Sequence, residues 1–423
     1  MLSRRGFRFE LRARPGELRQ ARRIAGACRW VWNRALAIQK QAMDQGAKRP
    51  RYLDLASQLT AWRNSPETSW LKQAPIHPLQ QTLRDLDRAW SNCFEKRARA
   101  PRFKRRGDKD AFRFPDPKQF KIDEANARVF LPKMHWLRYR RSRDIEGEPK
   151  NITVALEGAR LFVSIQTERE VDVPLHPSAD AVGIDLGVVH FATLSTGEQL
   201  PGLRDLDRRA RRLARHQRRV ARRVRGSRNQ RKARDHVARV HRKISRARQD
   251  HHHKLSTELV RRCSVIAIED LHVKSMSASA SGTIQAPGTN VRAKTGLNRS
   301  ILQQGWGSFV TMLGWKMQAA AGRLITVPAA YTSQMCSACG HCAAENRTTQ
   351  AGFACVACGH AQNADHNAAR NILARALSTA AGTAALPGGT GEVTPVRYER
   401  VQLDHSGQEP TKARSGVCLP NPL

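Results

Sequence analysis

The sequence predicts a multi-domain protein that combines α+β and α/β architectures. Three observations support this fold class. Hydrophobic residues at helical spacing fill much of the first 100 residues, and an alternating pattern over 151–170 is typical of a β-hairpin. After residue 180, short apolar strands that end in acids alternate with helical segments. The length of 423 residues corresponds to roughly three domains.

The N-terminal hundred residues predict one strand followed by helices. Phe7, Phe9 and Leu11 alternate with polar residues, as in a half-buried strand. Helical spacing begins after Pro15 and returns over residues 79–94. We interpret the aromatic residues of these helices as core residues, with base stacking as the alternative.

A small antiparallel β domain is predicted to follow. The hairpin over 151–170 turns at Glu157 and Gly158, and residues 129–139 also have strand character. We expect both segments to share a sheet with the N-terminal strand. A further strand is predicted over 182–185, where a new domain begins.

Basic residues concentrate in two segments. Residues 204–248 contain 20 Lys or Arg and three acids. A thin apolar stripe runs along this segment and is interrupted at Gly226-Ser227. This pattern predicts two antiparallel arginine-rich helices with a turn between them. Residues 96–106 contain seven basic residues in eleven. A solvated helix face normally mixes charges of both signs, so one sign at this density favours a surface that follows a nucleic-acid backbone.

The whole-chain charge points to the same partner. With 74 Lys+Arg and 36 Asp+Glu, the formal net charge is +38, and nucleic acid is the polyanion that such a surface binds through counterion release. A membrane partner is not expected, because the basic residues are widely spread and no stretch of 18 apolar residues exists. The arginine-rich N-terminus is unlike a secretory signal, and the clustered cysteines indicate a reducing interior, so we expect a cytoplasmic protein.

Three acids are candidates for a metal-dependent active site. Asp185 and Glu269 each end an apolar strand, and Asp365 opens a helix, so their side chains can converge above a sheet. Convergent carboxylates suit Mg²⁺ or Mn²⁺, and two such ions about 4 Å apart support phosphodiester hydrolysis. Asp270 competes with Glu269, because neighbouring strand residues face opposite ways and the pattern leaves the choice open.

A cysteine cluster predicts one structural zinc ion. Cys336-x₂-Cys339 and Cys355-x₂-Cys358 are each followed by glycine, as in the knuckles of a four-cysteine zinc ribbon. Cys342 forms another CxxC with Cys339, and two histidines lie nearby, but the symmetric set is favoured. The histidine run at 251–254 is expected to be exposed or to contact nucleic acid, because adjacent residues of a helix face different ways.

These motifs together resemble the TnpB (OrfB) family, transposon-encoded RNA-guided endonucleases that are ancestor-like relatives of type V CRISPR effectors. The resemblance covers about residues 5–377. It rests on a set of motifs in a characteristic order: GIDLG (183–187), IAIEDL (266–271), LNRSILQQGWG (297–307), YTSQMCSACG (331–340), CVACG (355–359) and DHNAARNIL (365–373).

The resemblance implies a domain layout. An N-terminal β-barrel (wedge) domain would comprise 1–20 and 101–178, with a helical recognition domain inserted at 21–100. An RNase H-like RuvC nuclease domain would comprise 179–330 and 363–377, and would include an arginine-rich hairpin at 204–250. The zinc ribbon would be inserted at 331–362, and the tail 378–423 is expected to be disordered.

The resemblance also implies a function. Such proteins bind a guide RNA from the flanking element, recognise a short duplex motif in double-stranded target DNA, and cut both strands at one Mg²⁺-dependent RuvC site. The family's catalytic acids map onto Asp185, Glu269 and Asp365, which favours Glu269 over Asp270. Its zinc ligands map onto Cys336, Cys339, Cys355 and Cys358.

We expect the two basic segments to contact nucleic acid, through Arg102, Lys104, Arg105, Arg106, Arg218, Arg219, Arg222 and Arg223. The protein would then associate with the nucleoid when it is on DNA. Three alternatives are a compact type V CRISPR effector, a transposase that joins DNA strands, and an RNA-guided repressor that does not cleave. The intact acids count against the repressor.

Overall fold

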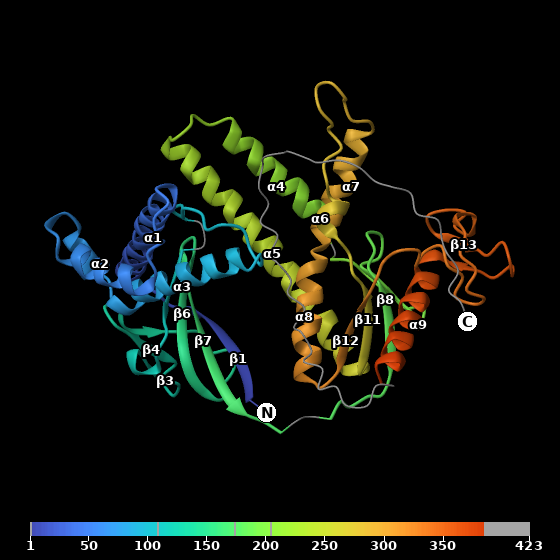
Figure 1. Cartoon of the computed structure of the whole chain (residues 1–423), viewed down its shortest axis with the longest axis horizontal. Coiled ribbons are helices and arrows are strands. Elements are labelled where there is room, and N and C mark those ends of the chain that lie inside the picture. Colours follow the sequence, from blue (N-terminus) through green and yellow to red (C-terminus); the bar gives the residue numbers. More distant parts are fainter. Residues whose placement is uncertain (1, 108–109, 173–174, 204, 385–423) are drawn as a thin grey trace. The chain divides into compact units, whose positions relative to one another are not determined.

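The computed structural model describes residues 2–107, 110–172, 175–203 and 205–384 (Figure 1). The chain divides into two compact units, Met1–Asp172 and Val173–Leu423. Separate hydrophobic clusters form within each unit. Both units contain helices and sheets, so the predicted multi-domain, mixed α/β fold class is confirmed.

A four-stranded antiparallel sheet in the order β1-β7-β6-β2 forms part of the first unit. Its strands are β1 (Leu2–Leu11), β2 (Ala111–Phe114), β6 (Glu148–Glu157) and β7 (Arg160–Glu170). Phe9 of β1 faces Val163 of β7, and both side chains are buried, as the alternating pattern predicts. The hairpin over 151–170 and its pairing with the N-terminal strand are therefore confirmed.

A separate three-stranded sheet corrects one expectation. It consists of β3 (Lys121–Asp123), β4 (Arg128–Leu131) and β5 (His135–Arg138). Residues 129–139 thus form a sheet of their own, with a short bridge to β1 between Leu11 and Tyr139. The physical reason is that β3 and β5 occupy both edges of β4, which leaves β4 no edge for the larger sheet.

Helices α1 and α3 of the first unit pack against β2 of the four-stranded sheet, and the helices pack against one another. They are α1 (Pro15–Asp44), α2 (Tyr52–Asn64) and α3 (Ile76–Phe94), with the 3-10 helices η1 (Pro66–Gln73) and η2 (Pro117–Gln119). Ile24, Cys28 and Val31 form the buried stripe of α1 at spacings of three and four residues. Trp32 and Trp90 also belong to the core, as expected.

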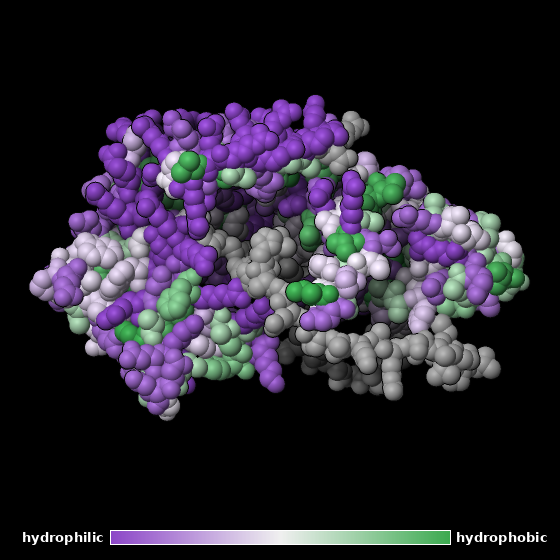
Figure 2. Space-filling view, turned by 90° about the horizontal axis from the view of Figure 1, so that it is seen from above, coloured by the Kyte–Doolittle hydropathy of each residue, from purple (hydrophilic) through white to green (hydrophobic). Residues whose placement is uncertain are grey.

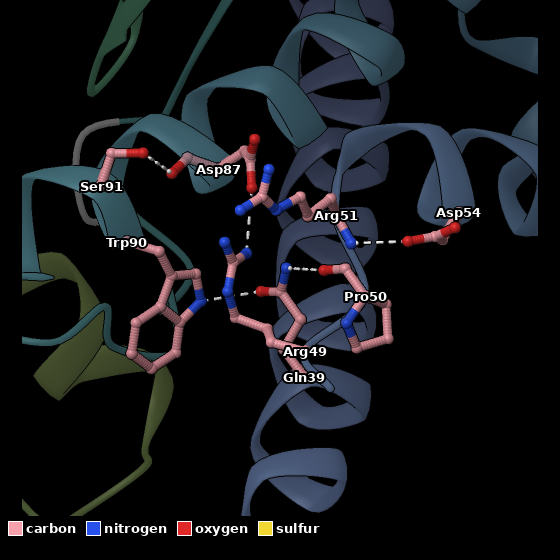
Figure 3. Close-up of polar contacts among 8 residues, drawn as sticks. All are labelled: Gln39, Arg49, Pro50, Arg51, Asp54, Asp87, Trp90 and Ser91. Carbon is pink, nitrogen blue, oxygen red and sulfur yellow. Dashed lines mark hydrogen bonds and ion pairs between the residues drawn. The ribbon is translucent and has the colours of Figure 1, made fainter. Parts of the chain in front are cut away.

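A polar bridge joins the α1–α2 connection to α3 (Figure 3). The amide of Gln39 accepts a hydrogen bond from Trp90 Nε1 at 2.8 Å and donates one to the carbonyl of Pro50 at 2.7 Å. Because Gln39 is fully buried, its amide requires both partners. Arg49 pairs with Asp87 at 2.9 Å beside it. These contacts fix the position at which the chain enters α2.

The second unit contains a five-stranded sheet in the order β10-β9-β8-β11-β12. Its strands are β8 (Ala181–Asp185), β9 (Ala192–Leu194), β10 (Gln199–Leu200), β11 (Val265–Glu269) and β12 (Arg323–Val327). Strand β11 lies between β8 and β12 and is parallel to both. Such a strand is covered on both faces, which explains its unbroken apolar sequence.

Helices α8 (Trp306–Ala319) and α9 (Ala364–Ala384) cover opposite faces of this sheet (Figure 1). Ile266 and Ile268 of β11 lie in the cluster that contains Phe309 of α8. The intervening Ala267 lies in the cluster with Ile372 of α9. The period-two alternation of β11 therefore assigns its residues to the two helix layers.

The arginine-rich segment forms the two predicted helices, α4 (Leu206–Ala221) and α5 (Arg228–Arg262). Ser227 caps α5 by accepting a hydrogen bond from the Gln230 N–H at 3.1 Å. Helix α5 extends well beyond residue 248 and includes the histidine run. His252 is only 1% exposed, and its ring nitrogens lie 3.0 Å from Ser308 Oγ and the Gln304 carbonyl. The expectation of an exposed or nucleic-acid-binding run is wrong for His252, because the start of α8 covers its face of the helix.

The remaining elements are α6 (Val273–Met276), α7 (Val291–Gln304), η3 (Ala344–Asn346), β13 (Gly352–Ala354) and β14 (Ala361–Asn363). Residues 378–384 of the expected disordered tail belong to α9, and the rest of that tail lies outside the described residues. No helix of the described part of the chain is long and apolar enough to cross a membrane.

Candidate functional site

Asp185 and Glu269 lie at the same edge of the second unit's sheet. Each is the last residue of its strand, and β8 and β11 are parallel neighbours. Ile184 pairs with Ile268, so the two acids occupy the next position along adjacent strands. This placement follows from the sequence pattern, because parallel strands bring their carboxyl ends together.

Asp365 reaches the same region from the first turn of α9. The side chain of Asn363 fixes this turn by accepting hydrogen bonds from the N–H groups of Asp365 (3.0 Å) and His366 (3.1 Å). The ring of His366 in turn lies 3.1 Å from the Ser195 carbonyl, next to β9. These contacts anchor the N-terminus of α9 at the acidic edge of the sheet.

Gly183 allows α9 to approach β8 closely. A Cβ atom at this position would lie 2.1 Å from the carbonyl oxygen of Ala369 and 2.8 Å from the nitrogen of Leu373. No side chain fits there, so the glycine in the GIDLG motif has a packing reason. The close contact places the helix that carries Asp365 directly over the strand that carries Asp185.

The three acids form a half-buried cluster. Burial raises the pKa of Asp185 to about 7, with further contributions from the charges of Glu269 and Asp365, against an opposing effect of Arg347. Burial also raises the pKa of Glu269, while a hydrogen bond from Thr332 and the charge of Arg375 oppose the shift. Cations bound among these groups would relieve the repulsion.

Glu269 and Asp270 differ sharply in environment. The Glu269 carboxylate accepts a hydrogen bond from Thr332, whereas Asp270 is exposed. The charge of Glu269 also acts on Asp185. Of the two neighbouring acids, Glu269 is thus the one that the structure brings to Asp185.

Sequence reasoning missed Thr332, which is 2% exposed and lies between β12 and the first cysteine pair. The buried Asn371 of α9 donates hydrogen bonds to the carbonyls of Thr332 at 2.9 Å and Met335 at 2.6 Å. Asn367, one turn earlier, also donates to the Met335 carbonyl, at 2.7 Å. Two asparagines at i and i+4 on an otherwise apolar helix face were the sequence signal for this network.

The four predicted zinc ligands lie together. Cys336 Sγ is 3.8 Å from Cys358 Sγ, and Cys339 Sγ is 3.6 Å from Cys355 Sγ. The two knuckles are alike, because Gly340 and Gly359 both have positive φ and donate their N–H groups to the carbonyls of the first cysteine in each pair. Cys342 lies outside this cluster and forms a β-bridge with Met335.

The two candidate metal sites differ in geometry. Zinc–sulfur bonds of about 2.3 Å in a tetrahedron put the sulfur atoms about 3.8 Å apart, so the cysteines fit one Zn²⁺. Among the described residues, these cysteines are the only group of three or more such ligands whose donor atoms all lie within 4.8 Å of one another. The three carboxylates are not such a group, so their oxygen atoms do not all lie as close together as the four sulfur atoms do.

The predicted nucleic-acid contacts lie in both units. In the first, the carbonyl of Arg102 accepts a hydrogen bond from Trp32 at 2.9 Å, and Lys104 Nζ lies 3.7 Å from the centre of the Trp32 ring. Arg105 and Arg106 are exposed. In the second, Arg218, Arg219, Arg222 and Arg223 are all exposed at the end of α4 and its turn. Hydrophilic residues dominate the visible surface (Figure 2).

Comparisons with known proteins reveal the family. The OrfB_IS605 model, described as "Probable transposase", matches residues 164–280, and a "Cas12f1-like, TNB domain" model matches residues 306–372. A protein of Escherichia coli (strain K12) named "Putative RNA-guided DNA endonuclease InsQ" is 48% identical over 368 residues, covering 87% of this chain and 91% of that protein. The chain belongs to the TnpB (OrfB) family.

Another relative extends this similarity over nearly the whole chain. A protein of Streptomyces pristinaespiralis named "Putative RNA-guided DNA endonuclease" is 32% identical over 418 residues. The match covers 98% of this chain and 98% of that protein. A solved Cas12f1-sgRNA-target DNA complex matches with a TM-score of 0.48 and 14% identity, over 83% of this chain and 81% of that one. A family model described as "Helix-turn-helix domain" matches residues 1–48, where the described residues form β1 and the single helix α1.

Proposed function

We propose that this TnpB family member is an RNA-guided DNA endonuclease that hydrolyses both strands of its target at a single RuvC-type site. The observation that carries this proposal is the approach of the half-buried acids Glu269 and Asp365 to Asp185, whose carboxyl feels the charge of both. Family membership and the names of two relatives support the guide-RNA and DNA partners.

The three acids would hold two Mg²⁺ or Mn²⁺ ions. When bound, these ions supply an activated water and stabilise the leaving oxygen in phosphodiester hydrolysis. The chain's own residues set the geometry: the strand ends fix Asp185 and Glu269, and the capped first turn of α9 fixes Asp365. Thr332 orients the carboxylate of Glu269 by donating a hydrogen bond to it.

The second unit would be an RNase H-like RuvC domain with an inserted structural zinc ribbon. Its parallel strands, covered by α8 and α9, and the four-cysteine cluster support this layout. A site with four thiolate ligands has no open position, so the zinc would stabilise the fold rather than take part in hydrolysis. In the first unit, the two sheets would be the wedge and α1–α3 the recognition helices.

Guide pairing would supply sequence specificity, and the basic segments would supply backbone binding. The arginine side chains of the hairpin would contact the phosphates of the nucleic acid and not its bases. This division of roles accounts for one chain that carries both a strongly basic helix pair and a small acidic site.

The direct test begins with protein purified from cells that carry its flanking DNA, so that any bound RNA is retained and can be sequenced. A discrete RNA with a variable 3′ end supports guidance, and random fragments contradict it. The complex should cut guide-matched DNA with Mg²⁺. Asp185→Ala should abolish cutting while RNA binding persists, and the exposed neighbour variant Asp270→Ala should cut normally. Cutting by Asp185→Ala would overturn the site assignment.

The family description as a transposase makes strand joining the second candidate. It predicts covalent products between donor ends and target DNA, which the same reactions would reveal on a denaturing gel. The RNA sequence also separates a transposon-encoded nuclease from a compact CRISPR effector, since the latter would carry repeat-derived RNA.

A further inference from the structure

A pocket of about 450 Å³ lies between α1 and η1 in the first unit. Two tryptophans, Trp30 and Trp70, line it with their rings nearly perpendicular at 82° and 5.8 Å between centroids. Trp62 supports Trp30 from another side, edge to face, at 5.5 Å. Trp70 remains 40% exposed, so a large aromatic surface is accessible to a flat ligand.

Three small residues, Gly26, Ala27 and Ala74, also line this pocket, and the glycine costs helix stability. Gly26 lies in the middle of α1, where glycine is less favourable than alanine. A Cβ atom there would meet only the end of the flexible Arg29 side chain, at 3.7 Å. Packing therefore does not require glycine at this position. A small residue at this position leaves the pocket open, whereas a large side chain would fill it.

Positive charge borders the pocket. The side chain of Asn33, which lines it, donates a hydrogen bond to the Lys104 carbonyl at 3.0 Å and accepts one from the Lys104 N–H at 2.8 Å. The neighbouring residue of α1, Trp32, donates to the Arg102 carbonyl. These bonds anchor the basic stretch 102–106 beside the tryptophans. An aromatic surface next to a basic stretch is the arrangement by which proteins hold single-stranded nucleic acid.

We propose that this pocket binds one unpaired nucleobase of the bound nucleic acid, stacked on Trp70, while the adjacent phosphates lie along 102–106. The proposal rests on the proposed function, because it takes nucleic acid as the partner. Nucleic acid carries both flat bases and phosphate charges, which matches aromatic walls next to a basic stretch.

The test uses the full chain loaded with its RNA. The probe is 2-aminopurine, a fluorescent adenine analogue, substituted singly at successive unpaired positions of the RNA and the target DNA. At one of these positions, the fluorescence emission of 2-aminopurine should change when the nucleic acid binds to the wild-type protein. The change should be lost in Trp70→Ala and in Gly26→Leu, whose side chain would fill the pocket, and nucleic-acid affinity should fall about 5- to 150-fold.

Three variants serve as controls. Trp136→Ala removes a tryptophan of the same unit with matched exposure, 41%, and should bind as the wild type. Trp70→Phe should retain most of the affinity, and Gly26→Ala should keep the pocket open while raising the thermal midpoint. Wild-type binding by both Trp70→Ala and Gly26→Leu overturns the pocket proposal. Failure of the wild type to cut guide-matched DNA overturns the proposed function instead.

Discussion

The hydroxyl of Thr332 donates a hydrogen bond to the carboxylate of Glu269. Its main-chain carbonyl is held by Asn371 of α9, the helix that also carries Asp365. Thr332 thus connects two of the three acids, and the segment on which it lies leads directly into the first zinc knuckle. If Glu269 holds a cation as proposed, Thr332 would orient this ligand without binding the metal itself.

Replacing Thr332 by valine should raise the Mg²⁺ concentration needed for half-maximal cutting about 10- to 100-fold, because the Glu269 carboxylate loses its orienting donor. Thr332→Ser keeps the hydroxyl and should stay close to the wild type. Calorimetric titration with Mn²⁺ provides a readout that does not depend on cutting. Equal Mn²⁺ affinity of the valine and serine variants would contradict this role.

The pKa of Asp185 predicts how stability responds to pH without divalent cations. The folded protein favours the neutral carboxyl, since its pKa is about 7 against an ordinary 3.8. The stabilisation is complete below pH 4 and is lost as pH rises through 7. The thermal midpoint of the wild type, measured relative to that of Asp185→Asn, should therefore decrease as the pH is raised from 5 to 8. A difference that does not change with pH, measured by scanning calorimetry, would refute the shift.

Removing one zinc ligand should empty the ribbon. Cys358→Ser should reduce the zinc content from one ion per chain to nearly none, as measured by mass spectrometry of the purified protein. Cutting should fall as well, because the first knuckle contacts the helix that carries Asp365. The Ser337 N–H donates a hydrogen bond to the side chain of Asn367 in α9 at 2.9 Å. Cys342→Ser, outside the cluster, should keep its zinc and its activity.

Adding a methyl group at Gly183 should destabilise the second unit by at least about 2 kcal/mol, since the new Cβ would overlap the backbone of α9. Gly296→Ala in helix α7 is the matched control. Nothing lies within 4 Å of a Cβ there, so it should stabilise by about 0.5–1 kcal/mol. Denaturant unfolding curves of the two variants would test the pair, and equal midpoints would refute the packing role of Gly183.

The exposed arginines of the α4–α5 turn should act through charge alone. Changing Arg218, Arg219, Arg222 and Arg223 to glutamine should lower the slope of log affinity against log salt by roughly 3. Changing all four to lysine should leave the slope near its original value. If the glutamine variant kept the wild-type slope, these residues would not contact phosphates.

Much of this organisation follows from local pattern. The strands ending at Asp185 and Glu269, the hairpin over 151–170 and the cysteine knuckles all have periodicities or spacings that one segment contains by itself. The buried state of His252 could not be predicted, because it depends on contacts with α8 more than 50 residues away. Thr332 could not be predicted from its own segment, because a single hydroxyl in a loop has no pattern, and only its partner Asn371 and the neighbouring Asn367 on α9 gave a signal.

The helix that carries Asp365 is made last among the described elements, yet it packs on β8, the first strand of its unit. During translation the arginine-rich helices leave the ribosome on the order of ten seconds before α9, at about 5–20 residues per second. A nascent chain would therefore gain its polycationic surface while its hydrolytic centre is still incomplete. A chain stalled before residue 364 should therefore bind RNA but leave DNA intact, so the order of synthesis would allow RNA to bind before the chain can cut.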